Sequence, residues 1–226
     1  MKFPYIGRLD SRGDIQVWLV NGSYIRSHID EEFTNFGQHY RYSYIPWNEF
    51  WIDVGNRDEI PFFIDHLLVE HRLMSKGMSY DKALKAADRV ERRERKATAS
   101  IYTTTDLTKF DRHSLHEVLW KMLSNGLQVW IVNGKGVRDN LDTDFTEGGN
   151  DMVYDFIPAY EIWIDDTIPT RERKFTVLHE LHERSIMAAG AHYPTAHASA
   201  SRLEASCRHH PENLEPILKA EGWSTL

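Results

Sequence analysis

The sequence predicts an α+β protein made of two copies of one unit, each a small antiparallel sheet followed by two helices. Three observations support this fold class. The chain has 226 residues, enough for two small domains, and 41% of them are apolar, enough for a sizeable core. Short β-branched and aromatic runs precede long helix-like runs, and this order occurs twice. The same composition excludes intrinsic disorder for the body of the chain.

The duplication is read directly from the residues. Residues 16–22, QVWLVNG, recur as residues 128–134, QVWIVNG, and about half of residues 16–53 are identical at this offset of 112. One inserted residue then raises the offset to 113, which places His66 opposite His179. A period above 100 residues is too long for a solenoid repeat. We therefore expect a first copy in residues 1–110 and a second in 111–226, packed pseudo-symmetrically because each copy has little core of its own.

The elements of the first copy follow in order. A β-branched and aromatic run at 17–20 leads into Asn21-Gly22, which is typical of a hairpin turn. The remaining strands expected in this copy are 24–29, 40–45 and 49–53. A helix is predicted over 61–76 with Gly77 as its stop, and a second over 80–95 with Ser79 as its N-cap.

The second copy is expected to repeat this plan. Its strands would lie between residues 129 and 165, its first helix over 171–189, and its second helix from about Pro194. Between the copies we expect a threonine-rich loop at 103–105 and a linking helix over 114–123.

Composition limits the classes of partner. A net charge of −7 disfavours binding of bare nucleic acid, and the basic stretch 89–96 is interspersed with glutamates that neutralise it as helical ion pairs. The single cysteine, Cys207, excludes an internal disulfide framework. The sequence has neither an apolar run of membrane-spanning length nor a signal-peptide pattern, so the expectation is a cytoplasmic protein with no membrane partner.

The densest group of metal-capable side chains lies in residues 178–184, LHELHER. On a helix, His179 and Glu183 share one face at i and i+4, whereas His182 lies at its edge. His197 and Glu204, seven residues apart, would line one side of the next helix. Two antiparallel helices would bring the four groups together. Histidine and carboxylate ligands suit Zn²⁺, with Mn²⁺ and Fe²⁺ as alternatives.

Residues 161–183 resemble the minimal zincin-type metallopeptidases, in which a strand and a short turn precede a helix that carries His-Glu-x-x-His. Here a strand-like run ending at Asp165 precedes His179-Glu180, and Glu183 takes the place of the second histidine. The resemblance implies that His179 is a zinc ligand and that Glu180 is the general base for a zinc-bound water. A carboxylate ligand in place of histidine would make the ion a weaker Lewis acid.

Comparison of the copies leaves two arrangements open. The first copy keeps His66, Glu70 and Glu91, but it has Leu67 opposite Glu180 and Leu84 opposite His197. One hypothesis is therefore that the second copy alone carries a site and that the first is a degenerate scaffold. The other is that His66, Glu70 and Glu91 also hold a metal, with His71 as a further ligand.

Two functions follow. The first is a divalent-metal-dependent hydrolase of peptide or amide bonds, with the metal on His179, Glu183 and His197, Glu180 as base, and Glu204 as a ligand or as the group that orients a ligand histidine. Its substrate would be a peptide or protein. The alternative is a non-enzymatic interaction protein in which the same side chains form a structural His/Glu cluster, with Arg184 or Arg202 as counter-ions, or hold a structural metal.

Overall fold

The computed structural model describes residues 4–98 and 110–223. The chain divides into two compact units, one of residues 1–107 with 138–144 and one of residues 108–137 with 145–226. Segment 138–144, which belongs to the second copy by sequence, is thus grouped with the first unit. The threonine-rich loop expected at 103–105 lies outside the described residues.

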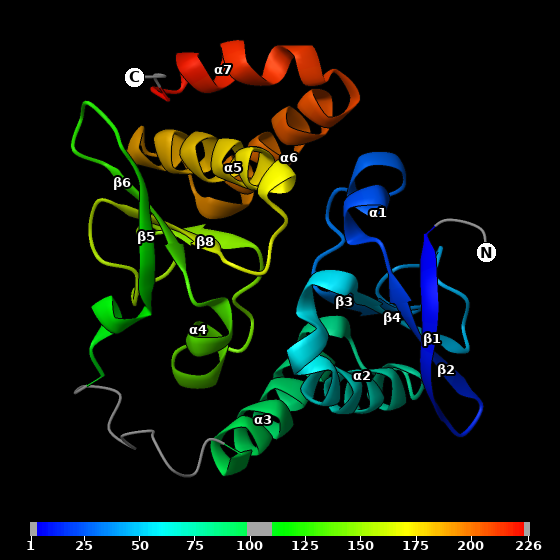
Figure 1. Cartoon of the computed structure of the whole chain (residues 1–226). Helices are drawn as coiled ribbons and strands as arrows, with labels where there is room; N and C mark the ends of the chain where they lie inside the picture. Colours follow the sequence, from blue (N-terminus) through cyan, green and yellow to red (C-terminus); the bar gives the residue numbers. More distant parts are fainter. Residues whose placement is uncertain (1–3, 99–109, 224–226) are drawn as a thin grey trace. The chain divides into compact units, whose positions relative to one another are not determined.

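The first copy consists of a four-stranded sheet and the two helices that follow it (Figure 1). Its elements are, in order, β1 (Tyr5–Arg12), β2 (Ile15–Val20), α1 (Gly22–His28), β3 (Phe36–Gln38), β4 (Glu49–Asp53), the 3-10 segment η1 (Val54–Glu59), α2 (Ile60–Met74) and α3 (Tyr80–Thr98). The strands are ordered β1-β2-β4-β3.

The second copy repeats this plan and adds a C-terminal helix. Its elements are, in order, the 3-10 segment η3 (Arg112–Leu115), β5 (His116–Met122), β6 (Gln128–Val132), α4 (Gly134–Asn140), β7 (Gly148–Asn150), β8 (Glu161–Asp165), α5 (Thr170–Ala188), α6 (Tyr193–His209), the 3-10 segment η4 (Pro211–Asn213) and α7 (Leu214–Ala220). The strand order is β5-β6-β8-β7, the same as in the first copy.

The expected fold class, a duplicated α+β unit, is confirmed, but the sheets are mixed and not antiparallel. β1 and β3 run antiparallel to their neighbours, whereas β2 and β4 are parallel, with Trp18 opposite Trp51. The second sheet has the same pattern, with Trp130 opposite Trp163. A parallel pair needs a crossover connection, and α1 and α4 lie in those connections.

Asn21-Gly22 is the reason for this difference, because it starts a helix and does not close a hairpin. The Asn21 side chain accepts a hydrogen bond from the Tyr24 backbone N–H and so caps α1. Gly22 lies against the Asp53 carboxylate, where an added Cβ would come within 1.9 Å of an oxygen. The strand expected over 24–29 was therefore wrong, and residues 40–45 form turns instead of a strand.

The linking helix expected over 114–123 was also wrong, because this stretch contains strand β5. β1 and β5 each pair with the next strand through two register shifts, which fall at matching points: Tyr5 pairs with Val20 and His116 with Val132. The duplication therefore begins one strand earlier than the sequence comparison indicated.

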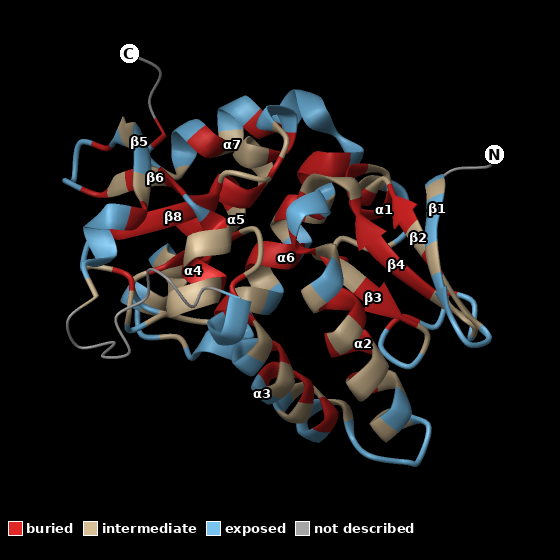
Figure 2. Cartoon of the chain, turned by 60° about the horizontal axis from the view of Figure 1, so that its bottom comes forward, coloured by how far each residue is buried: buried red, intermediate tan, exposed pale blue. Residues whose placement is uncertain are grey.

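The other predicted helices are confirmed as α2, α3, α5 and α6, and each predicted boundary lies within three residues of the observed one. Gly77 and Gly190 have φ of +85° and +100°, the left-handed conformation that ends a helix. α5 lies over β8 (Figure 1), contacts β7 as well, and buries Val177, Leu178 and Leu181 in the core of the second copy. Figure 2 shows the burial of β8, all of whose residues are buried. Within the described ranges, no helix has the length and apolar character needed to cross a membrane.

Candidate metal centre

Helices α5 and α6 bring the predicted site residues of the second copy together. α5 carries His179, Glu180 and Glu183 on consecutive turns, and α6 carries His197 and Glu204. α5 has a buried polar stripe, which includes Glu180 and Glu183, beside its apolar one. Burying carboxylates away from water is costly unless they are paired, so this stripe requires cationic or hydrogen-bonding partners.

Three ligand atoms converge between the helices. Nε2 of His179 lies 3.1 Å from Nδ1 of His197, which lies 3.0 Å from Oε2 of Glu183. The remaining separation, from His179 Nε2 to Glu183 Oε2, is 3.8 Å. Ligands about 2.0–2.1 Å from a tetrahedral Zn²⁺ ion are about 3.3 Å apart. The three separations lie on either side of this value, so the group could hold a metal ion.

The chemistry of this donor set also fits a cation. Glu204 accepts Nδ1–H of His179, so the proton that a metal ion would replace is the one on Nε2 of that ring. Loss of this proton would leave a lone pair that faces Nδ1 of His197 and Oε2 of Glu183. One N–H, on His197, is then shared by two acceptors. A metal ion between the three atoms would satisfy every lone pair at once.

Glu204 does not join these three atoms, because it binds the other nitrogen of the His179 ring. Its Oε2 is 3.0 Å from His179 Nδ1, and its Oε1 accepts from Arg208 at 2.8 Å. Arg208 also binds Glu172 at 2.6 Å. A carboxylate on the distal nitrogen fixes the tautomer and the orientation of a metal-binding histidine. The geometry thus gives Glu204 the orienting position of the two roles expected for it.

Glu180 is buried beside Glu183, and both carboxylates share one donor. Nδ2 of Asn150, at the end of β7, lies 2.9 Å from Oε2 of Glu180 and 2.9 Å from Oε1 of Glu183. Burial raises the pKa of Glu180 to about 7, against the opposing effect of the His179 charge. Glu180 can therefore both take and release a proton near neutral pH, as a general base must.

The electrostatics of the cluster favour a positive charge at His179. Burial alone would lower the pKa of His179, but its hydrogen bonds to Glu183 and Glu204 raise it to about 11. Burial would raise the pKa of Glu183, yet the bonds to His179 and His197 lower it to about 2. The same negative surroundings that hold a proton on His179 would stabilise a metal ion that replaced it.

The cluster is accessible from one side. The side chain of His197 is 35% exposed, whereas that of Glu183 is 3% exposed. Tyr193, at the start of α6, stacks on the His197 ring with the ring centroids 5.3 Å apart. A molecule from solvent would thus approach the three ligand atoms past His197 and Tyr193.

The first copy keeps the framework of this cluster but lacks two of its members. His66 Nδ1 binds Glu91 at 2.7 Å, Arg95 binds Glu91 at 2.8 Å, and Gln38 binds Glu70 at 2.6 Å. These contacts repeat those of His179, Glu204, Arg208, Asn150 and Glu183. The differences are Leu67 in place of Glu180 and Leu84 in place of His197.

Among the described residues, His66 consequently has no second imidazole beside its Nε2, and the nearby Asp88 carboxylate lies 3.8 Å from its Nδ1 instead. Its Nε2 is buried without a hydrogen-bond partner, 3.7 Å from Glu70 Oε2. His71, suggested from the sequence as a further ligand, instead contacts the Trp47 carbonyl oxygen at 3.3 Å. Among the described residues, the first copy has no group of three ligand atoms like that of the second.

Several members of the network were missed in the sequence. Arg208, and not Arg184 or Arg202, is the counter-ion of Glu204, while Arg184 binds Asp151. The signal was present in the duplication, because the residue pairs of the network recur at the same offsets: Gln38 with Asn150, Glu59 with Glu172, and Arg95 with Arg208.

His182 belongs to a separate network. Its Nδ1 lies 2.7 Å from Glu221, and its Nε2 lies 3.1 Å from Ser199 Oγ. These contacts join α5, α6 and the end of α7, and they leave His182 outside the ligand set.

Comparison with known proteins assigns no family. The chain matches no family model, no curated protein and no solved structure.

Proposed function

We propose that the second copy binds a divalent metal ion, Zn²⁺ in first place, through His179, Glu183 and His197, and that it hydrolyses a peptide or amide bond there. The observation that carries the proposal is the convergence of Nε2, Oε2 and Nδ1 from two helices at 3.0–3.8 Å. Two histidines and one glutamate with an open position form a known ligand set of catalytic zinc sites. Bound there, Zn²⁺ would acidify a water molecule and polarise the substrate carbonyl.

The side chains around the three ligands support hydrolysis over storage of a metal ion. Glu180 would accept a proton from the attacking water and pass it to the leaving nitrogen, and Asn150 holds its carboxylate in place. Glu204 would keep Nε2 of His179 directed at the metal. The resemblance of residues 161–183 to zincin-type metallopeptidases supports the same roles for His179 and Glu180.

The decisive variant is Glu180→Gln, which keeps the size and the buried position of the side chain. We expect the zinc content and the unfolding temperature to persist, while cleavage of internally quenched fluorescent peptides by the zinc-loaded chain falls about 10²–10⁴-fold, the usual contribution of a general base. Glu215→Gln, at an exposed glutamate that pairs with Lys174, is the matched control and should keep its activity. Cleavage that is unaffected by Glu180→Gln would refute the mechanism.

The competing function is an interaction protein with a structural His/Glu cluster, and one observation favours it. The first copy retains the Arg95–Glu91–His66 chain without the third ligand, so this part of the network has a structural use. If the zinc-loaded wild-type chain cleaves no peptide, or if purified metal-free protein binds no zinc, this second function is preferred.

A further inference from the structure

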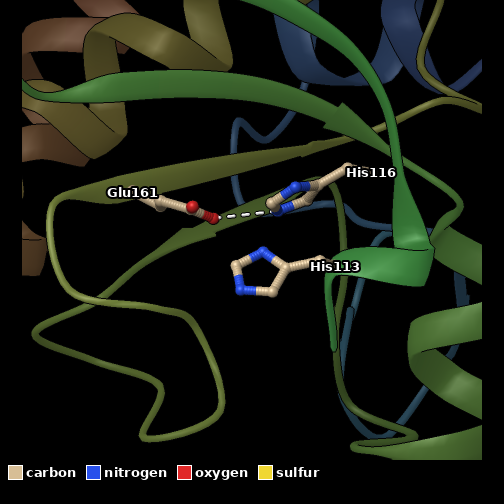
Figure 3. Close-up of side chains that lie close together, drawn as sticks. All are labelled: His113, His116 and Glu161. Carbon is tan, nitrogen blue, oxygen red and sulfur yellow. Dashed lines mark hydrogen bonds and ion pairs between the residues drawn. The ribbon is translucent and has the colours of Figure 1, made fainter. Parts of the chain in front are cut away.

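A second cluster of histidines and a carboxylate lies where η3 joins β5, beside the first residue of β8. It consists of His113, His116 and Glu161, and each residue offers one ligand atom within 4.8 Å of the others (Figure 3). None of the three belongs to the α5–α6 cluster. All three lie in the same compact unit, so their arrangement does not depend on how the two units are placed.

Two of the three ligands are held in position by tryptophans. Nε2 of His116 lies 2.9 Å from Oε2 of Glu161, and Nε1 of Trp163 donates to the same oxygen at 2.7 Å. The His116 ring stacks on Trp130 with centroids 4.1 Å apart and an interplanar angle of 10°. Fixing ligand orientation in advance reduces the entropy that binding costs.

The third ligand is on the solvent side. His113 is exposed, and its ring lies edge-on to that of His116 with centroids 5.1 Å apart. The Asp111 carboxylate accepts a hydrogen bond from the His113 backbone N–H at 3.0 Å and so caps the short segment that carries it. Figure 3 shows the His113 ring beside the pair formed by His116 and Glu161.

The first copy has the equivalent carboxylate and tryptophan but no histidine beside them. There Tyr5 occupies the place of His116, and its hydroxyl donates to Glu49 Oε2 at 2.9 Å while Trp51 donates to the same oxygen at 2.8 Å. The carboxylate and its tryptophan are therefore common to both copies and structural. Only the second copy adds imidazoles, at the two positions where they share a site with the carboxylate.

We propose that His113, His116 and Glu161 form a second divalent-metal site, selective for Zn²⁺-class ions over Ca²⁺ and Mg²⁺. Two imidazoles and one carboxylate suit Zn²⁺, whereas Ca²⁺ and Mg²⁺ prefer oxygen ligands alone. The bound ion would tie the segment Arg112–Leu115 to β5 and β8. Its remaining coordination positions would face solvent on the side of His113.

The test counts zinc in a chain from which the α5–α6 site has been removed. In a His197→Leu background, which carries the first copy's residue at this position, metal-free protein dialysed against Zn²⁺ should bind one equivalent per chain. Adding His116→Tyr, again the first copy's residue, should abolish this binding while preserving the hydrogen bond to Glu161 and therefore the fold. His113→Ala should weaken binding at least tenfold.

The control is His210→Asn, which removes an exposed histidine of the second copy and should leave the single equivalent unchanged. Ring signals of His113 and His116 in NMR spectra should shift as Zn²⁺ is added, and excess Mg²⁺ should not displace it. A His197→Leu chain that binds no zinc, or one whose zinc persists after His116→Tyr, overturns the proposal. Either result leaves the proposed hydrolase untouched, because the two ligand sets share no residue.

Discussion

Each ring nitrogen of His179 has a different partner, and the site depends on this division. Nδ1 faces Glu204, and Nε2 faces His197 and Glu183. Because Glu204 accepts from Nδ1–H, a metal ion would displace the proton on Nε2, and the lone pair freed there is directed into the cluster. Glu204 in turn is held by Arg208, so the protonation state of a single ring is set by a chain of buried charges.

Glu204→Gln tests this arrangement. The amide keeps the size of the side chain but weakens its bond to His179, so we expect the affinity for Zn²⁺ to fall about 10–100-fold, as is usual when a group supporting a metal ligand is lost. Competition with a chromophoric chelator measures this change. Glu91→Gln makes the same substitution in the first copy and should leave zinc affinity unaltered. Equal losses in both variants would show that the effect is one of general stability.

At the scale of elements, Asn21-Gly22 and its repeat Asn133-Gly134 decide the topology of each sheet. Both asparagine side chains accept a backbone N–H from the following helical turn: Asn21 from Tyr24 at 3.0 Å and Asn133 from Gly136 at 2.6 Å. Helix initiation at this point sends the chain across the sheet to a parallel partner strand. A hairpin would have produced the antiparallel order that the dipeptide alone predicts.

Asn21→Ala should therefore destabilise the protein by about 1 kcal/mol, the usual cost of a lost N-cap. Urea unfolding followed by circular dichroism measures it. Asn213→Ala is the matched control, because Asn213 precedes α7 at an N-cap position without a side-chain capping bond. We expect its cost to be a few tenths of a kcal/mol. An equal cost at both positions would mean that the Asn21 hydrogen bond contributes nothing.

The sequence predicts the long elements well and the short ones poorly. α2 and α5 have 15 and 19 residues. Over that length, helical periodicity and residues typical of helix ends, such as a first-turn proline or a terminal glycine, together predict a helix. β3 and β7 have three residues each, and their strand character comes from pairing with distant residues. In β5 two register shifts interrupt the alternation of side chains, which removes the period-two pattern of a strand.

The same distinction applies to the candidate site. His179 and Glu183 follow from helical spacing, and His197 follows from its replacement of Leu84 between the copies. Asn150 could not be found by local pattern, because it reaches the site only through the pairing of β7 with β8. The separation of roles between Glu204 and the three converging atoms depends on which ring nitrogen each group faces, and residue types alone do not encode this.

For the whole molecule, duplication separates the part of the site that both copies share from the part that the second copy adds. The chain of contacts from arginine through glutamate to histidine exists in both copies, so it is part of the folded framework. What distinguishes the second copy is one additional carboxylate and one additional imidazole, Glu180 and His197. Metal binding should follow the added imidazole, His197, and hydrolysis the added carboxylate, Glu180, whereas the shared framework should give neither.

Leu84→His should therefore give the first copy a metal site. Nε2 of His66 is buried without a hydrogen-bond partner and lies 3.7 Å from Glu70 Oε2, so two ligand atoms are already in place and Leu84 occupies the position of the third. We expect zinc bound per chain, counted by elemental analysis after dialysis, to rise by one equivalent over the wild-type chain. Leu84→Asn, a polar substitution without an imidazole, should not change the count. A folded Leu84→His chain with the wild-type zinc content would show that the His66 framework cannot bind a metal, and it would remove the argument that the two networks are equivalent.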